Sequence, residues 1–113
     1  MAPSQQLALL PGTLELLILR TLRLGPAHGH QITKHIQWST EDLLRVEHGS
    51  LYPALHRLER RGWLAATWEK RDGNREFKYY RLTAVGRKHL IVEESKWARL
   101  VDGMAKVTAR TEG

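Results

Sequence analysis

The chain has 113 residues, and its 18 Lys and Arg against 12 Asp and Glu give a formal net charge of +6 with histidine neutral. This length fits one small domain with an appendage, and a basic excess favours nucleic acids or anionic surfaces as partners. Cysteine is absent, which excludes disulfides, cysteine-ligated zinc and a cysteine nucleophile.

Two helices are predicted in the first part of the chain. Apolar residues occur almost all round the stretch 13–24, which predicts a central core helix that ends at Gly25-Pro26. Ile32 and Ile36 lie four apart and predict a second, short helix over 30–37. No apolar run approaches the ~20 residues of a membrane span, so we expect a cytoplasmic protein with no membrane contact.

A third helix is predicted over 51–61, with Ser50 as its N-cap, Pro53 in its first turn and Gly62 just past its end. Its inward stripe consists of leucines at i, i+4 and i+7. The other side is polar and basic, and carries Tyr52, His56, Arg57, Arg60 and Arg61. A helix with an apolar back and a basic front suits the major groove of B-DNA, which is about 12 Å wide.

A β-hairpin is predicted next, with strands over 64–69 and 77–82 and turn chemistry at Asp72-Gly73-Asn74. The tip, 70–75, is expected to expose Lys70, Arg71 and Arg75. Trp63 and Trp68 are expected to pack the hairpin against the third helix.

A long last helix is predicted from about Ala84 to Lys106 or beyond, capped by Thr83 and followed by a frayed tail over 108–113. Its apolar stripe is too long for so small a domain to cover, which predicts a homodimer with two-fold symmetry. The residues expected at the dimer interface are Leu90, Trp97, Leu100, Val101, Met104 and Val107.

The fold expected from this order is mainly α with a small β-hairpin. Residues 7–82 form a winged helix-turn-helix, and residues 83–113 form a C-terminal dimerisation helix and tail. Residues 49–82 hold eight basic and four acidic residues, whereas residues 1–48 are neutral overall. The basic charge therefore peaks on the segment that such a fold presents to double-stranded DNA. The predicted DNA contacts are Ser50, Tyr52, Pro53, His56, Arg57, Arg60, Lys70, Arg71, Asn74, Arg75 and Lys78.

Several motifs resemble the PadR family of transcriptional regulators over about residues 7–108, with most likeness to its short, acidobacterial-type subgroup. They are LPGTL (10–14), GHQI (29–32), GSLYPALHRLE (49–59), GWL (62–64), KYYRLT (78–83) and Gly86. The resemblance implies a homodimeric, usually repressing protein that binds pseudo-palindromic operators. One position departs from the family pattern, because His30 stands where an aromatic residue is common.

The resemblance also implies an effector site. In short drug-binding members of the family, a tryptophan fourteen residues after the last threonine of the hairpin lines a pore between subunits. Trp97 is in that position relative to Thr83, and flat aromatic ligands stack well on indole. Glu93 and Glu94 nearby would suit a cationic ligand. The competing interpretation is that Trp97 only packs the dimer interface.

Other functions find less support in the residues. The motifs of phosphate loops and nucleophile elbows are missing, so we expect no enzyme activity. Six histidines invite a metal site, but neither HExxH nor a suitable His-x₃-His pair is present, so no metal or cofactor is expected. The alternative functions are a protein-interaction module, an RNA-binding domain, or a non-specific nucleic-acid binder without a small-molecule effector.

Overall fold

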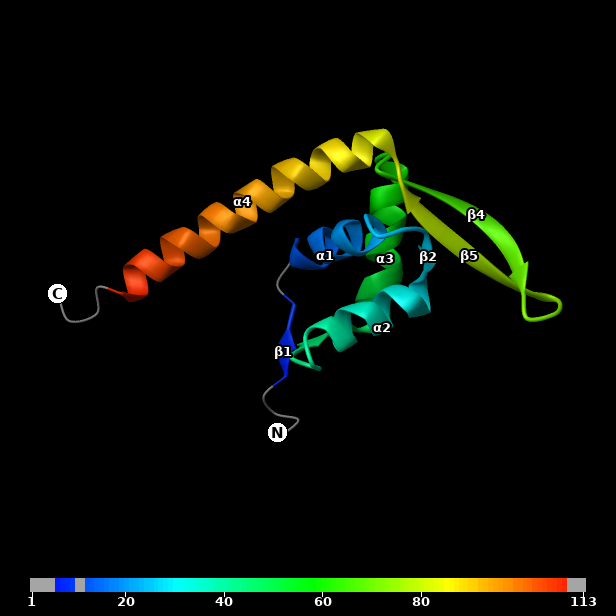
Figure 1. Cartoon of the computed structure of the whole chain (residues 1–113), viewed down its shortest axis with the longest axis horizontal. Coiled ribbons are helices and arrows are strands. Elements are labelled where there is room, and N and C mark those ends of the chain that lie inside the picture. The colour runs from blue at the N-terminus through cyan, green and yellow to red at the C-terminus, as the bar shows by residue number, and fades with distance from the viewer. Residues whose placement is uncertain (1–5, 10–11, 110–113) are drawn as a thin grey trace.

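The computed structural model describes residues 6–9 and 12–109, and helices make up most of this part of the chain (Figure 1). The predicted mainly α fold with a hairpin and a long last helix is confirmed. Residues 10–11 of the LPGTL motif and 110–113 of the tail lie outside the described residues. In chain order the elements are β1 (Leu7–Ala8), α1 (Thr13–Leu22), β2 (Ala27–His28), α2 (Gly29–Ser39), β3 (Leu44–Arg45), α3 (His48–Arg60), β4 (Leu64–Arg71), β5 (Arg75–Leu82) and α4 (Ala84–Thr108).

Helix α1 is the core helix that its nearly continuous apolar surface predicts. Ile18 and Leu19 are fully buried, and α1 contacts the other three helices as well as β5. Figure 1 shows α1 lying beneath α4 and above α2. The remaining core side chains come mainly from α3 and the hairpin, and include Leu51, Leu55, Leu58, Leu64, Tyr80 and Leu82.

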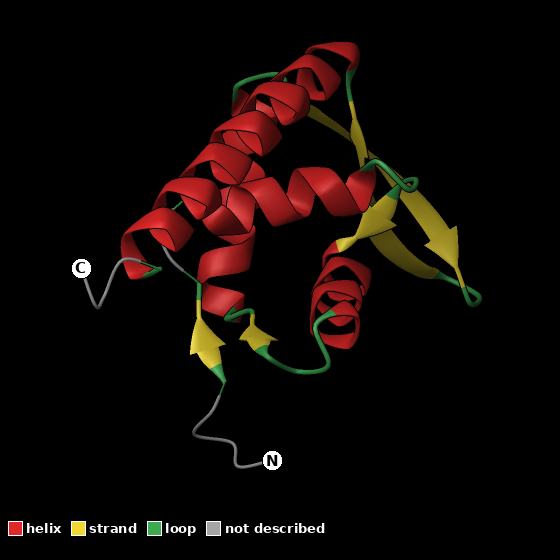
Figure 2. Cartoon of the chain, turned by 60° about the vertical axis from the view of Figure 1, so that its left-hand side comes forward, coloured by secondary structure: helices red, strands yellow, loops and turns green. Residues whose placement is uncertain are grey.

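A third strand, which the sequence did not predict, joins the hairpin. Strand β2 pairs antiparallel with β5, and the sheet order is β2-β5-β4. A strand of two residues is too short to show an alternating pattern in the sequence. Because β2 leads directly into α2, it ties the start of that helix to the hairpin. Figure 2 shows that the far end of the hairpin stands clear of the helices.

Helix α2 begins one residue earlier than the expected helix and ends two residues later. His28 is its N-cap, and its Nδ1 accepts a hydrogen bond from the Gln31 backbone N–H at 3.4 Å. The Gln31 side chain accepts in return from the His28 backbone N–H at 3.0 Å. This reciprocal pair is a capping box made with histidine, a residue that the usual N-cap preferences do not suggest.

The start of α3 corrects the prediction for Ser50. Glu47 is the N-cap residue, and its carbonyl accepts from the backbone N–H groups of Ser50 and Leu51, both at 3.0 Å. Ser50 therefore lies in the first turn, and Pro53 lies in the second turn rather than the first. The predicted end is confirmed, because Gly62 has a φ of 80° just past the helix.

The hairpin turn is confirmed at Asp72 and Gly73, whose φ angles of 52° and 85° are left-handed. Both strands run further toward the tip than expected, so Lys70, Arg71 and Arg75 belong to strands and the loop has three residues. Trp68 is 66% exposed, so its predicted core position is wrong. It shares a face with Leu64, but at residue 68 this face borders an open hollow instead of packing on a helix. Trp63 is partly buried and stacks on His89 of α4, with ring centroids 4.0 Å apart.

The junction between the hairpin and α4 is tightly packed. Thr83 is the N-cap as predicted, and its hydroxyl accepts from the Gly86 backbone N–H at 3.0 Å. The same hydroxyl lies 2.7 Å from the Gly62 carbonyl oxygen. A Cβ added at Gly86 would meet the Trp63 carbonyl oxygen and the Leu82 side chain, so only glycine fits there.

We expect Gly86→Ala to lower the free energy of unfolding by about 1–3 kcal/mol, because the added methyl group meets backbone that cannot move away easily. Gly103→Ala in the same helix is the matched control, since a Cβ there meets nothing within 4 Å. It should raise the stability by about 0.5–1 kcal/mol through helix propensity. Urea unfolding at one protein concentration measures both, and equal effects at the two sites would contradict the packing at Gly86.

Candidate nucleic-acid interface

Helix α3 presents a polar face to solvent because its apolar face is fully committed to the core. Leu51, Leu55 and Leu58 are completely buried. On the opposite side, the exposed residues are Gly49, Tyr52, Pro53, His56 and Arg60. Four of the predicted DNA contacts thus lie together on one face. Ser50 is exposed as well, in the first turn of the helix.

Arg57 is exposed as well, but unlike this group it forms an ion pair with a neighbouring helix. Its Nη2 lies 3.0 Å from Glu15 Oε2, so the guanidinium is held against α1. A charge on the flank of a helix that is paired with a neighbouring helix positions the helix and has less freedom to contact a ligand. Arg57 is exposed as predicted, with its guanidinium engaged by Glu15, and its predicted contact with DNA stays a prediction.

Lys78 bridges the other flank of α3. Its Nζ donates to Glu59 Oε1 at 3.1 Å and lies 5.1 Å from the centroid of the Tyr80 ring. Burial of Lys78 opposes its charge, but the hydrogen bond to Glu59 and the nearby Tyr80 outweigh burial and raise the lysine pKa. Burial also raises the pKa of the Tyr80 hydroxyl, with Lys78 acting against it. Lys78 thus ties the hairpin to α3.

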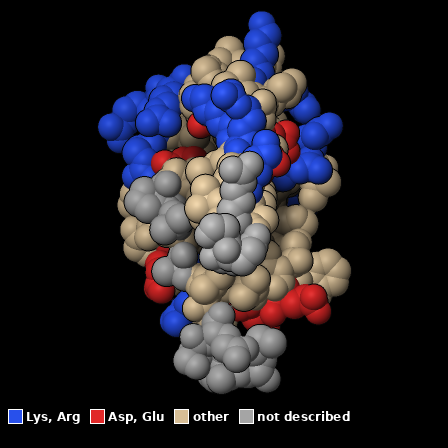
Figure 3. Space-filling model, turned by 90° about the vertical axis from the view of Figure 1, so that its left-hand side faces the viewer, with Lys and Arg blue, Asp and Glu red and all other residues tan. Residues whose placement is uncertain are grey.

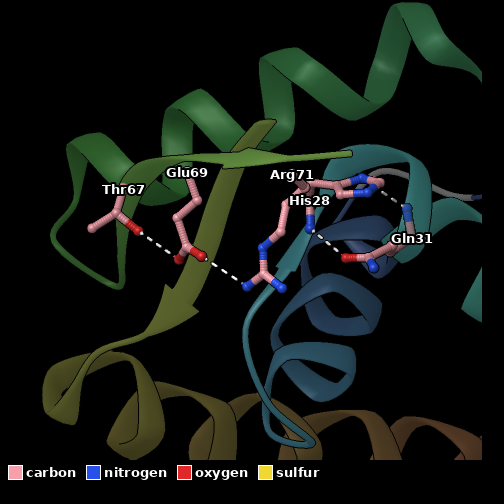
Figure 4. A network of polar contacts seen from close by, with 5 residues as sticks. All are labelled: His28, Gln31, Thr67, Glu69 and Arg71. Atoms are coloured by element: carbon pink, nitrogen blue, oxygen red, sulfur yellow. Dashed lines mark hydrogen bonds and ion pairs between the residues drawn. The ribbon is translucent and has the colours of Figure 1, made fainter. Parts of the chain in front are cut away.

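The outer face of the hairpin, which carries Arg71, Arg75, Phe77 and Tyr79, holds arginines on aromatic rings. Arg71 lies 5.1 Å from the centroid of Tyr79, and Arg75 lies 5.5 Å from that of Phe77. Arg71 also donates to Glu69 at 2.8 Å, which is the main cause of its raised pKa. Figure 4 shows the hydrogen bonds that link Thr67 to Glu69 and Glu69 to Arg71, beside His28 and Gln31. Lys70 and Asn74 are exposed near the tip.

A hollow of about 440 Å³ separates α3 from the hairpin. The start of α2, the outward face of α3 and the inner face of the hairpin line it. His30 and Trp68 both contribute, although neither was predicted as a site residue. A period-two pattern put Trp68 on the core side of its strand, and His30 lies in a separate helix, so neither had a local signal that marked it.

The exposed apolar surface of α4 begins where the domain ends. Leu90 is only 2% exposed and belongs to the core of its own protomer, so its predicted place at a dimer interface is wrong. The rest of the stripe is exposed, and consists of Trp97, Leu100, Val101, Met104 and Val107. Figure 3 looks at the end toward which α4 projects and shows Lys and Arg gathered mainly in its upper half, with uncharged surface below them.

Beside this stripe lies an apolar groove of about 460 Å³ between α1, α4 and the β1 segment. Trp97, 47% exposed, forms one wall, and Leu16 and Leu17 of α1 form another. The carboxylates predicted beside a ligand both have partners on the protein. Glu94 lies 3.4 Å from Arg20, and Glu93 lies 3.4 Å from Lys96.

A family model described as the transcriptional regulator PadR-like family matches residues 18–91, more than half of the chain. The chain belongs to the PadR-like family of transcriptional regulators. The resemblance seen in the sequence motifs is therefore confirmed. The match covers α3 and the whole hairpin, while the exposed part of the α4 stripe lies beyond it.

Solved structures of related proteins share this fold. A PadR family transcriptional regulator from Eggerthella lenta is 37% identical, with 86% of this chain and 82% of that chain covered and a TM-score of 0.73. A transcriptional regulator from Clostridium thermocellum is 27% identical, with coverage of 81% and 89% and a TM-score of 0.76. Bacillus subtilis PadR, solved in complex with operator DNA, is 28% identical, with coverage of 69% and 45% and a TM-score of 0.63.

Residues 6–9 and 12–109 contain no cluster of three or more side chains arranged to hold a metal ion. Among the described helices, none combines the length and apolar character that crossing a membrane requires.

His28, the N-cap of α2, should make the stability of the fold depend on pH. Burial, and then the charge of nearby His30, lower the pKa of His28 from its usual 6.5. His28 therefore binds a proton more readily in the unfolded chain than in the folded one. Its contribution to stability is complete above about pH 6.5, and it is lost as the pH falls through the lower pKa that His28 has in the folded chain. Thermal unfolding between about pH 5 and 7.5 should show this loss.

His28→Asn keeps a capping side chain but removes the titration, so its melting temperature should fall less than that of the wild type as the pH is lowered. His48→Asn, at an exposed position, is the control and should behave as the wild type. If His28→Asn and the wild type lost stability in parallel, His28 would not be the group responsible.

Proposed function

We propose that the protein is a sequence-specific, double-stranded-DNA-binding transcriptional regulator that acts as a homodimeric repressor. The observation that carries the proposal is the outward face of α3, where Tyr52, His56 and Arg60 project from a helix whose other side is fixed in the core. The complex of Bacillus subtilis PadR with operator DNA supports the same class of partner for this chain.

In this proposal α3 lies in the major groove and the hairpin tip reaches the adjacent backbone or groove. Arg60, Lys70 and Arg75 are the cations placed to meet phosphates or base edges, and none of them has an ion pair with a described residue. Arg57 and Lys78 position α3, while Arg71, held on Tyr79, is oriented toward the DNA backbone. Each phosphate contact releases counterions, so affinity should fall with salt.

The exposed α4 stripe supports the dimer. Five apolar side chains from Trp97 to Val107 recur at helical spacing on one face, and such a face is stable in water only when it is covered. A symmetric partner that uses the same face would bring two copies of α3 to successive major grooves, about 34–36 Å apart. Residues 7–82 would then bind DNA, and residues 83–113 would hold the dimer together.

We expect selection of bound sequences from a random duplex pool to yield a two-fold symmetric consensus. Arg60→Ala should weaken binding to that consensus and reduce the salt slope of log K by about 0.9, because one phosphate contact is lost. Arg57→Ala is the matched control in the same helix and should leave the slope unchanged. Anisotropy titrations of labelled duplex at several salt concentrations measure both.

Met104→Lys tests the dimer in the same assay, since a buried charge at the stripe should give monomers in sedimentation equilibrium and lose the symmetric consensus. Equal affinity for unrelated sequences would instead identify a non-specific nucleic-acid binder. Failure of the wild-type protein to bind any duplex would overturn the proposal.

We further propose that a small aromatic ligand occupies the groove beside Trp97 and releases the repressor from DNA. The support is the size of the groove, about 460 Å³, and its apolar lining with one indole wall. In the dimer this groove would adjoin the interface, so a ligand there could alter the angle between the two winged domains.

Titration with rhodamine 6G, a planar aromatic cation, should quench tryptophan fluorescence without DNA present. Trp97→Phe should lose at least about tenfold in affinity for the dye, because the indole surface is removed. Trp38→Phe is the control, as Trp38 is 81% exposed and does not line the groove. No quenching, or equal quenching in both variants, would favour a purely structural role for Trp97.

A further inference from the structure

The hollow between α3 and the hairpin has no role in the proposed contacts of α3 and of the hairpin tip with the grooves of DNA. His30 comes from the start of α2, Tyr52 and His56 come from α3, and Trp68 and Lys78 come from the hairpin. Trp68 and His56 are exposed in the free protein.

The position of the hollow defines what can occupy it, if the proposed DNA binding is correct. The major and minor grooves of a duplex are separated by a sugar–phosphate strand. When α3 enters a major groove and the hairpin tip reaches the neighbouring groove, the strand between the grooves must cross the gap between α3 and the hairpin. That gap is the hollow.

We propose that this hollow seats one sugar–phosphate strand, with Trp68 packed against a deoxyribose and with His30 and His56, once protonated, donating to its phosphates. The proposal rests on the proposed DNA-binding function and adds two contacts, His30 and Trp68. It also gives His56 a specific role.

Trp68 suits a strand better than it suits water. Its indole offers a large apolar body and a single N–H donor, which match the C–H surface of a sugar and the oxygen of a phosphate. It shares the inner face of the hairpin with Lys78, directly opposite in the register. Because it is 66% exposed, covering it on binding removes apolar surface from water.

The histidines matter because the permanent charges around the hollow largely cancel. Of the charged side chains that line the hollow, Lys78 is paired with Glu59 at 3.1 Å, and Glu76 adds a negative charge. Attraction for a phosphate at this point therefore depends on imidazole, the side-chain type that changes charge between about pH 6 and 8. The titratable and charged groups that line or flank the hollow are His28 from β2, His30 from α2, Tyr52, His56 and Glu59 from α3, and Lys70, Glu76, Lys78 and Tyr80 from the hairpin.

His28 is the least suited of the three imidazoles to donate to a phosphate. Its Nδ1 already accepts from the Gln31 N–H, and its ring stacks on Phe77 with centroids 4.9 Å apart. A proton at Nδ1 would break the cap of α2. His30 and His56 have no hydrogen bond of this kind among the described residues, so their ring nitrogens can bind a phosphate without breaking a cap.

The first test compares two exposed tryptophans by anisotropy, on a labelled duplex that carries the selected consensus. Trp68→Ala should weaken binding roughly tenfold, as expected for one well-packed aromatic contact. Trp38→Ala is the matched control at the far end of α2 and should bind as the wild type. Circular dichroism checks that both variants fold. Wild-type affinity for Trp68→Ala would overturn the role of Trp68.

The second test measures the salt slope at two pH values. For the wild type the slope should steepen between about pH 8 and 6 by up to roughly 1.8, since two added cations each neutralise one phosphate. The double variant His30→Gln, His56→Gln should show the same slope at both pH values, whereas His35→Gln, on another part of α2, should behave as the wild type.

The outcomes separate this inference from the function on which it rests. If the wild type binds no duplex, the proposed function fails. If the wild type binds but neither Trp68→Ala nor pH alters binding, α3 and the hairpin contact DNA without a strand in the hollow, and the inference is overturned. A slope that steepens equally in the double variant would overturn the role of the two histidines.

Discussion

The seating of α3 is the constraint on which the rest of the structure depends. Leu51, Leu55 and Leu58 are completely buried, and each contributes roughly 1.5–3 kcal/mol relative to an exposed leucine. Turning the helix by one residue position would bring these leucines toward water, so the direction of its polar face follows from the packing of its apolar face. Ion pairs at both edges reinforce this orientation, from Arg57 to α1 on one side and from Glu59 to the hairpin on the other.

The same packing determines how much of the basic charge is left without an ion pair. The sequence places eight basic residues between 49 and 82, but Arg57, Arg71 and Lys78 each lie within about 3 Å of a carboxylate. Exposed ion pairs contribute little to stability, yet they fix where long side chains lie. The cationic surface left for a partner is therefore smaller than the composition indicates, and consists of Arg60, Arg61 and Arg81 with Lys70 and Arg75 near the hairpin tip. A small number of well-placed cations favours a defined site over general attraction to polyanions.

Elements with a long periodic pattern could be predicted from the sequence, and elements set by distant partners could not. The four helices and the hairpin follow from apolar spacing, Gly62 and the Asp72-Gly73 turn. The two-residue strand β2 has no pattern of its own, because its pairing depends on Tyr79 and Tyr80 some fifty positions later. The contact of Arg57 with Glu15 spans 42 positions, and helical spacing alone cannot reveal it. The exposure of Trp68 depends on where the helices stop covering the sheet, which is a tertiary property.

Helix α4 illustrates the same limit and suggests how the parts are coupled. Leu90 and Trp97 lie on one stripe, seven residues apart, yet the first is in the core and the second is exposed, because the domain ends between them. The groove beside Trp97 has α1 as its other wall, and α1 also supplies Ile18 to the core and Glu15 to Arg57 of α3. An effector changes DNA affinity only if it binds the two states of the protein differently. Helix α1 has only ten residues and contacts the groove, the core and α3, so it is the element whose position both sites share.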